Sequence, residues 1–237
     1  MSNGERRGRG RPEFDAHVRS YEAELGVGLA VTGEDRQYFA RERIAWLAKC
    51  VASLGMRLGA VLDLGCGDGT TTPVLLQVLG AGSVLGVDVS PESVDEANRR
   101  FSSAVVRFCP LSEYVPAGEC DLVYSSGTLH HILPRDRRGF AELAYRALRP
   151  GGLFAVWENN PYNPGTRYIM RRVAFDSDAI PIAAFRTRAL ARQAGFRILR
   201  TDYLFVFPHA LRGLRALEPL VSRLPLGGQY QVLCRKP

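Results

Sequence analysis

The chain has 237 residues, of which 46% are hydrophobic and 23% charged, and its formal net charge is +7. This length suffices for one large α/β core, and no stretch reaches the roughly 18 apolar residues that a membrane-spanning helix needs. No apolar signal segment opens the chain, so we expect a cytoplasmic protein. Its five cysteines include no Cys-x-x-Cys pair, which argues against a zinc site or a disulfide framework. We therefore predict no metal.

Much of the basic excess lies in residues 1–12, where four arginines against one glutamate give a net +3. Because this segment has almost no apolar side chain to bury, it is predicted to be a disordered basic tail. A solubilising leader is the simpler interpretation, and binding to RNA phosphates is the alternative. The remaining residues, 13–237, are expected to form a single domain.

Residues 13–54 are expected to form a helical segment ahead of the first strand. Gly33, Glu34 and Asp35 indicate a helix start. Apolar residues then recur at roughly helical spacing, at Tyr38, Ile44, Trp46, Leu47, Val51 and Leu54. Such a pattern predicts a helix that packs one face on the rest of the fold.

The most informative stretch is residues 60–69, a short apolar run that ends in glycines at alternate positions. This pattern predicts a buried strand that leaves its sheet through a tight turn, since glycine alone tolerates positive φ and lets a ligand approach the backbone. Thr70 stands where the dinucleotide-binding pattern requires its last glycine, and the Gly-Lys-Ser/Thr of mononucleotide-binding loops is absent. Asp63 and Asp68 would repel a pyrophosphate and attract an ammonium or sulfonium group.

Four further segments are predicted to be strands of the same sheet. Residues 83–88 end in Asp88, at the distance from the glycine turn where a carboxylate meets a ribose in Rossmann-like folds. Residues 104–108 and 120–126 are short apolar runs, and residues 148–156 lead through a Pro-Gly-Gly turn into another. Threonine and serine followed by proline after the first two strands predict that a helix begins there.

In their order and spacing, the segments at 60–69, 83–88, 120–126 and 148–156 resemble the motifs of class I S-adenosylmethionine-dependent methyltransferases. The resemblance implies an α/β fold, with a Rossmann-like, mostly parallel seven-stranded sheet and helices on both faces. It also implies an antiparallel C-terminal hairpin and a helical N-terminal cap, which would be residues 13–54. The implied cofactor is S-adenosyl-L-methionine.

The resemblance also assigns residues to the cofactor. Asp88 would bind the ribose hydroxyls, with a helix-capping acid as the plainer alternative. Leu111 stands where many relatives have an acid for the adenine amino group, so that acceptor is missing. Tyr21 and Arg43 match cap residues that contact the cofactor in some relatives, the alternatives being a core aromatic and a surface arginine. The predicted cofactor-binding set is Tyr21, Arg43, Asp63, Gly65, Gly67, Asp88, Val89, Leu111, Ser112 and Ser126.

Candidates for catalysis follow the fourth and fifth strands. His130 and His131 leave the sheet edge beside the predicted cofactor site, where a histidine can act as a general base near neutral pH or hold a substrate group. Many relatives carry a similar Leu-His-His, so a structural role is the alternative. Glu158 could accept a proton or bind a hydroxyl, and the alternative is a turn held by the neighbouring asparagines.

Residues 162–182 are too irregular for a strand and are predicted to form a substrate lid. Tyr162 and Tyr168 are the candidates for contact with the acceptor. The aromatic side chains of this lid favour a moderately apolar acceptor.

The last part of the chain is predicted to form a helix at 187–194 and strands at 196–207 and 229–235, which would be the hairpin that the resemblance implies. Residues 208–224 between these strands are expected to form a helix. Its buried face would carry Leu211, Leu214, Leu217, Leu220 and Val221. His209 at its start is more simply a capping or surface residue than a catalytic one.

The predicted function is methyl transfer from S-adenosylmethionine to an oxygen or carbon of a small organic acceptor, such as a natural-product or lipid-pathway intermediate. An RNA methyltransferase and a non-catalytic partner protein with the same fold are the alternatives. The expected partner is a small molecule rather than a nucleic acid, and the chain is expected to be a monomer or a homodimer.

Overall fold

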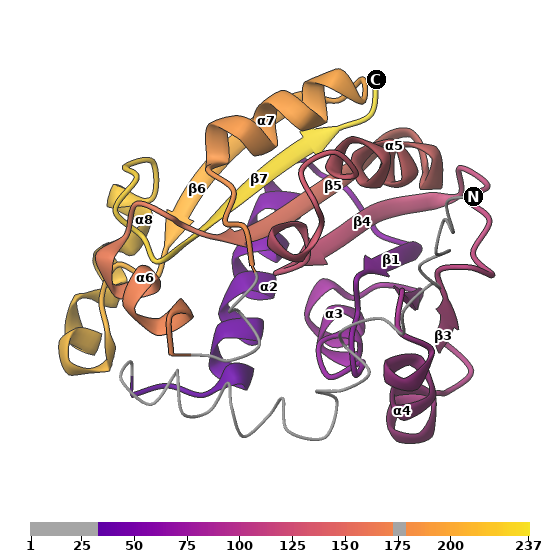
Figure 1. Ribbon diagram of the computed structural model, residues 1–237, viewed down its shortest axis with the longest axis horizontal. Coiled ribbons are helices and arrows are strands. Elements are labelled where there is room, and N and C mark those ends of the chain that lie inside the picture. Colours follow the sequence, from indigo (N-terminus) through magenta and orange to yellow (C-terminus); the bar gives the residue numbers. More distant parts are fainter. Residues whose placement is uncertain (1–32, 173–178) are drawn as a thin grey trace, which may run out of the picture.

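The structure is a computed structural model that describes residues 33–172 and 179–237. These residues form a seven-stranded sheet in the order β3-β2-β1-β4-β5-β7-β6 (Figure 1). Strand β7 runs antiparallel to both β5 and β6, whereas the remaining neighbours pair in parallel. The predicted Rossmann-like sheet with an antiparallel C-terminal hairpin is thus confirmed.

Strands and helices alternate along most of the chain, as a parallel sheet with crossover helices requires, but no described helix separates β3 from β4. The strands are β1 (Ala60–Leu64), β2 (Ser83–Asp88), β3 (Val106–Pro110), β4 (Cys120–Ser126), β5 (Leu148–Asn159), β6 (Arg197–Leu204) and β7 (Gln229–Arg235). The α-helices are α2 (Arg36–Ser53), α3 (Thr72–Leu79), α4 (Pro91–Phe101), α5 (Arg137–Ala147), α6 (Pro164–Met170), α7 (Ala184–Gln193) and α8 (Glu218–Val221). The described residues also include the 3₁₀ helices η3 (Leu129–His131) and η5 (His209–Leu217).

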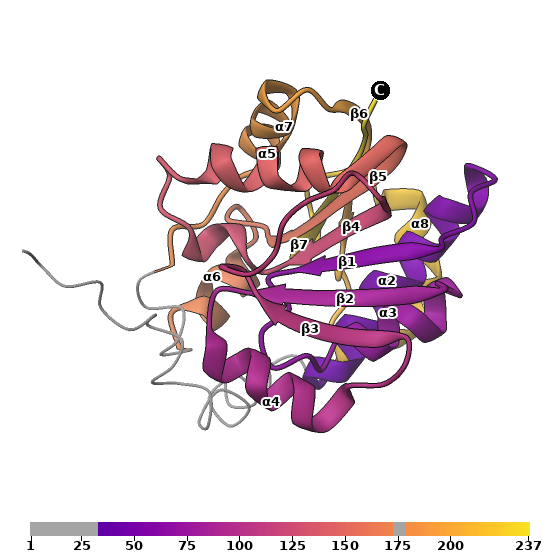
Figure 2. The same cartoon turned by 90° about the vertical axis from the view of Figure 1, so that its right-hand side faces the viewer.

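Successive residues of the central strands pack against opposite helical layers. In β5, Leu153, Ala155 and Trp157 contact the cluster that contains residues of α2 and α3. Phe154 and Val156 contact the cluster that contains residues of α5 and α7. Figure 2 shows α5 and α7 together on one side of the strands. Helices cover both faces of the sheet, so the side chains that point to either face of a central strand are apolar.

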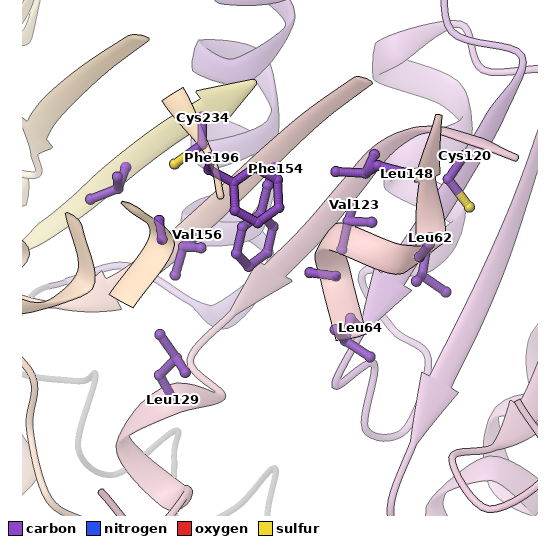
Figure 3. Packing of buried hydrophobic residues seen from close by; sticks show 14 of the residues in the cluster. Leu62, Leu64, Cys120, Val123, Leu129, Leu148, Phe154, Val156, Phe196 and Cys234 are labelled. Atoms are coloured by element: carbon purple, nitrogen blue, oxygen red, sulfur yellow. The ribbon is translucent and has the colours of Figure 1, made fainter. Parts of the chain in front are cut away.

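The core on the α5 and α7 face of the sheet contains two aromatic rings in contact. The rings of Phe154 in β5 and Phe196 before β6 lie 5.2 Å apart between centroids, and Figure 3 shows Val156 beside them and Leu129 farther off in the same cluster. Leu129 is 2% exposed and directly precedes His130. This packing fixes the backbone from which the catalytic candidates project.

Helix α2 confirms the helix start predicted at residues 33–35. The Asp35 carboxylate caps the helix by accepting a hydrogen bond from the Tyr38 amide at 2.7 Å. Ile44 and Leu47 are fully buried, as their spacing indicates. Residues 1–32, which include the basic tail and Tyr21, lie outside the described residues, so the tail and most of the cap stay predictions.

The expected helix at 208–224 is wrong in form and in burial. The segment folds as η5 with a kink at Leu211, followed by the single turn of α8. Its leucines are exposed instead of buried, at 48%, 43%, 47% and 80% for Leu211, Leu214, Leu217 and Leu220. Their three-residue spacing forms a stripe on a 3₁₀ helix, which has three residues per turn. Strand β6 also ends earlier than predicted, because Phe205 turns the chain with a φ of 64°.

Candidate active site

The chain leaves β1 through a turn in which Gly65, Gly67 and Gly69 have positive φ angles of 82°, 54° and 75°. The Gly65 amide donates a hydrogen bond to the Val87 carbonyl at 2.8 Å, which ties the turn to β2. A Cβ at position 65 would lie 2.6 Å from Cγ2 of Thr128. The loop after β4 therefore approaches this turn so closely that only glycine fits at position 65.

Asp88 ends β2 beside the same turn. Its carboxylate is 7% exposed and accepts the Gly67 amide at 2.8 Å and the Ser90 amide at 3.0 Å. Ser90 in turn caps α4 by accepting from the Ser93 amide. The acid thus joins the end of β2, the glycine turn and the start of α4 at the crevice where open α/β sheets bind ligands.

Asp63 is the most deeply buried acid at this edge, with 2% of its surface exposed. Its carboxylate accepts a hydrogen bond from the Thr72 hydroxyl, at the start of α3, at 2.7 Å. Burial raises the pKa of Asp63 to about 7; the Thr72 hydrogen bond opposes this rise, and the nearby carboxylates of Asp88 and Asp68 add to it. A cationic group bound here would favour the ionised carboxylate.

Asp68 is held by an arginine that the sequence did not single out. Arg36, the first residue of α2, donates to both oxygens of Asp68 at 3.0 and 2.8 Å. Although burial opposes ionisation, these hydrogen bonds hold the pKa of Asp68 below its ordinary value. The Arg36–Asp68 ion pair thus connects the start of α2 to the glycine turn. No local sequence signal identifies it, because the two residues are distant in the chain.

Arg43 projects from α2 toward the same space. Its Nη1 donates to Oε1 of Gln229, the first residue of β7, at 3.0 Å. The Nε of Arg43 and the hydroxyl of Tyr124 are buried, and among the described residues neither makes a hydrogen bond of good geometry, although the hydroxyl lies near the side chains of Arg43 and Ser126. Burial raises the pKa of the Tyr124 hydroxyl, so it stays protonated and can donate. Both residues line the cavity, where such donors fit a carboxylate of a bound ligand.

His130 and Glu158 form a buried pair. Nδ1 of His130 lies 2.6 Å from one oxygen of Glu158, and the other oxygen accepts the Leu129 amide at 2.7 Å. The two side chains are 5% and 1% exposed. The ring contacts that of His131, with 4.1 Å between centroids. This arrangement holds the imidazole of His130 in one orientation at the wall of the cavity.

A cavity of about 730 Å³ joins these groups. It extends from the glycine turn to a mostly apolar region between α5, α6 and the segment after β6. Of the predicted residues, its lining includes Arg43, Asp63, Gly65, Gly67, Asp88, Val89, Leu111, Ser126, His130 and His131. The apolar region is lined by residues that sequence reasoning missed, chiefly Phe140, Ile169, Met170, Phe205 and Phe207.

Four predicted residues do not line this cavity. Glu158 lies behind His130, and Ser112 is an exposed residue of the turn after β3. Tyr162 and Tyr168 are 68% and 45% exposed, and Tyr168 stacks under the guanidinium of Arg172. Their neighbours Asn163, Thr166 and Ile169 face the cavity instead. The lid at 162–182 stays a prediction, because residues 173–178 lie outside the described residues.

The fold and this cavity define an α/β protein with a ligand-binding cavity at the carboxyl edge of its sheet, where carboxylates surround a glycine turn. A sequence model described as "Methyltransferase domain" matches residues 61–152. A trans-aconitate 2-methyltransferase of Methylobacterium nodulans is 32% identical over 227 residues, which cover 83% of each chain. The chain belongs to the S-adenosylmethionine-dependent methyltransferases of class I, in the small-molecule group that includes this relative.

Solved structures agree with the fold. The putative methyltransferase of Haloferax volcanii, solved with the activator Trm112, matches with a TM-score of 0.64 at 19% identity and covers 96% of this chain and 99% of that one. Human N-acetylserotonin methyltransferase with bound S-adenosylmethionine matches with a TM-score of 0.64 at 18% identity, over 94% of this chain and 58% of that one. These structures support the fold alone. The sequence relatives show that the protein is an enzyme that uses S-adenosylmethionine as its methyl donor and a small molecule as its acceptor.

Proposed function

We propose that this enzyme methylates an oxygen atom of a small acceptor that has a largely apolar body and a hydroxyl at the reacting end. The observation that carries the proposal is the buried His130–Glu158 pair at the cavity wall. A carboxylate on Nδ1 keeps the proton of the neutral ring on that nitrogen and makes Nε2 the nitrogen that accepts a proton. His130 then serves as the general base, and Glu158 as the residue that positions it.

The cofactor supplies an electrophilic methyl group on a sulfonium. As the acceptor oxygen bonds to that methyl carbon, the carbon–sulfur bond breaks and the hydroxyl proton passes to Nε2 of His130. The protein must also hold the two reactants in line and exclude water. Phe140, Ile169, Met170 and Phe207 surround the acceptor region and favour a dry, apolar body.

Methylation of a carboxylate is the second candidate, favoured by relatives named for trans-aconitate. A carboxylate has no proton to lose, so it needs no base. Trans-aconitate itself carries three carboxylates, and the cavity suits it poorly. Among the described residues, the three lining arginines are already hydrogen-bonded or paired: Arg36 to Asp68, Arg43 to Gln229 and Arg215 to Glu34. Because few cationic groups are left to pair with an acceptor, an acceptor with at most one carboxylate fits the cavity better.

The test is an acceptor screen with S-adenosylmethionine labelled in its methyl group. The panel contains phenols and enols with apolar bodies, apolar monocarboxylic acids and trans-aconitate, and each reaction is run from acid to alkaline pH. We expect uptake into hydroxylated acceptors, with a rate that falls by about a hundredfold in His130→Asn. Uptake by carboxylic acids alone, without loss in His130→Asn, would overturn the proposal.

A further inference from the structure

The segment between β6 and β7 presents an exposed apolar face. We call it the leucine face, because it consists mainly of six leucines with exposed fractions of 43% to 80%: Leu211, Leu214, Leu217, Leu220, Leu224 and Leu226. Figure 1 shows η5 and α8 beyond the ends of β6 and β7. The side-chain amide of Asn163, just before α6, donates to the Leu226 carbonyl at 2.8 Å, so the exposed Tyr162 lies next to this face. Exposed apolar patches of this kind mark surfaces that bind a partner or a membrane.

The segment that carries the leucine face has no carboxylate pointing outward among its leucines. Glu218 is the one acidic residue in residues 208–228, and its carboxylate is turned inward. It accepts hydrogen bonds from the backbone amides of Phe205, Val206 and Phe207 at 3.3, 2.9 and 3.3 Å. The leucine face therefore carries no outward carboxylate.

The charges beside the leucines are basic. Arg212 is exposed next to Leu211, with one nitrogen 2.9 Å from Nε2 of His209. Arg223, next to Leu224, is 59% exposed although its Nε lies 3.6 Å from the buried carboxylate of Asp202. Leucines interleaved with arginines, without acids, are typical of segments that lie in the interface of an anionic bilayer. Two copies of this face would oppose arginine to arginine, which disfavours a symmetric dimer through it.

The same segment forms one wall of the cavity. Phe207, Pro208 and Arg215 line it, while Leu214 and Leu217 on either side of Arg215 face outward. Arg215 is anchored there by Glu34 at 2.8 Å and by the Phe207 carbonyl at 3.2 Å. A surface bound by the leucines would thus adjoin the apolar region of the cavity.

From this juxtaposition we infer that the leucine face binds the surface of an anionic lipid bilayer, next to which the enzyme takes up its apolar acceptor. The uptake part of this inference rests on the proposed function; the binding part does not. None of the helices described here has the length and hydropathy to cross a membrane, so the contact is peripheral. Leucine side chains would enter the headgroup region while Arg212 and Arg223 meet lipid phosphates.

The test is flotation of the full chain with vesicles of phosphatidylcholine alone or mixed with phosphatidylglycerol. The variant Leu217→Ser/Leu220→Ser removes two leucines, and Val115→Ser/Leu133→Ser removes two equally exposed apolar side chains elsewhere. A third variant, in which Arg6, Arg7, Arg9 and Arg11 become glutamine, removes the basic tail's contribution. We expect binding to the mixed vesicles only, about tenfold weaker in the leucine variant and retained in the other two. Melting curves check that each variant is folded.

Absence of binding by the wild type would overturn the inference, as would equal binding by the leucine variant or loss of binding in the tail variant alone. So would a wild-type dimer in solution that the leucine substitutions convert to a monomer, since a second copy would then be the occupant. Methyl transfer to a water-soluble acceptor, measured without vesicles, separates the two proposals. Its absence alongside vesicle binding would refute the proposed function and leave the membrane contact standing.

Discussion

Nδ1 of His130 lies 2.6 Å from Oε2 of Glu158, and the second oxygen of this carboxylate accepts the Leu129 amide. Glu158 is the last residue but one of β5, whereas His130 belongs to η3 after β4. The carboxylate therefore holds both the ring and the backbone that carries it. A histidine oriented in this way by a buried acid keeps one tautomer, which is the requirement for a directional proton acceptor.

Glu158→Gln should lower kcat far more than it changes KM. The Gln oxygen can still accept the Leu129 amide, but its NH₂ then faces Nδ1 of His130 and favours the tautomer with the proton on Nε2. That tautomer cannot accept the acceptor's proton, so we expect a loss of about 10² to 10³ in kcat. Steady-state kinetics with a hydroxylated acceptor measure it.

The matched control is His209→Asn, since His209 is 45% exposed and does not line the cavity. It should leave kcat and its pH profile unchanged. A Glu158→Gln enzyme with wild-type kcat would show that the pair has only a structural role.

Asp88→Asn should weaken cofactor binding by about 10-fold to 100-fold, because hydrogen bonds to a charged group contribute about 1.5–3 kcal/mol. Asp121→Asn is the control: its carboxylate also accepts two backbone amides, those of Gly59 and Ala60, but it lies outside the cavity. Both changes should lower the melting temperature, and calorimetric titration should separate them. Equal affinity in the two variants would show that Asp88 acts on the fold and not on the ligand.

Cofactor binding should release a proton below neutral pH. Because the folded pKa of Asp63 is raised to about 7, mainly by burial, the free protein holds this carboxyl largely protonated at pH 6. A bound cation favours the ionised form, so affinity should increase as pH rises toward 7 and level off above it. Titrations in buffers of different ionisation enthalpy should report a release of roughly half to one proton near pH 6.5.

Asp63→Asn should abolish this proton release and flatten the pH dependence between 5 and 7. Its effect on stability has a definite sign. Since the folded pKa lies above the ordinary value, the wild type loses stability as pH rises from about 4 to 7, and the variant lacks that loss. If the Asp63→Asn variant releases as many protons on cofactor binding as the wild type, the proton comes from another group.

The sheet, and the residues that line the cavity beside the glycine turn, could be predicted because their signals are local. The glycine turn at 65–69 and the acid at position 88 are each recognisable from a few neighbouring residues. The Rossmann-like order of the strands then brings them together. Residues such as Val89 and Leu111 follow from their place at strand ends. Nothing comparable points to Arg36, whose importance comes from a partner that only the folded chain supplies.

The apolar region of the cavity could not be predicted, because its lining depends on contacts between segments that are distant in the sequence. Phe205 and Phe207 were assigned to a strand, yet the amides at 205–207 bind Glu218 and turn the chain toward the cavity. Tyr162 and Tyr168 were chosen for their chemistry, but a one-residue change of phase on α6 directs Ile169 inward instead. The spacing of the leucines after Pro208 predicts a buried helix face, yet they are exposed, because apolar spacing alone cannot distinguish a core from an exposed surface.

Gly65→Ala and Gly67→Ala should differ sharply, although both glycines have positive φ. The conformational cost for alanine is about 1–2 kcal/mol at either position. At position 65 the new Cβ also meets Thr128, whereas at position 67 no atom lies within 4 Å of it. Overpacking adds about 1–3 kcal/mol, so Gly65→Ala should be the more destabilising variant by several degrees in melting temperature. Thr128→Ala removes the clashing Oγ1 and Cγ2 atoms, and a double-mutant cycle with Gly65→Ala should recover most of that extra cost. If Thr128→Ala leaves the cost of Gly65→Ala unchanged, close approach of the β4 loop does not explain the glycine, and backbone conformation alone does.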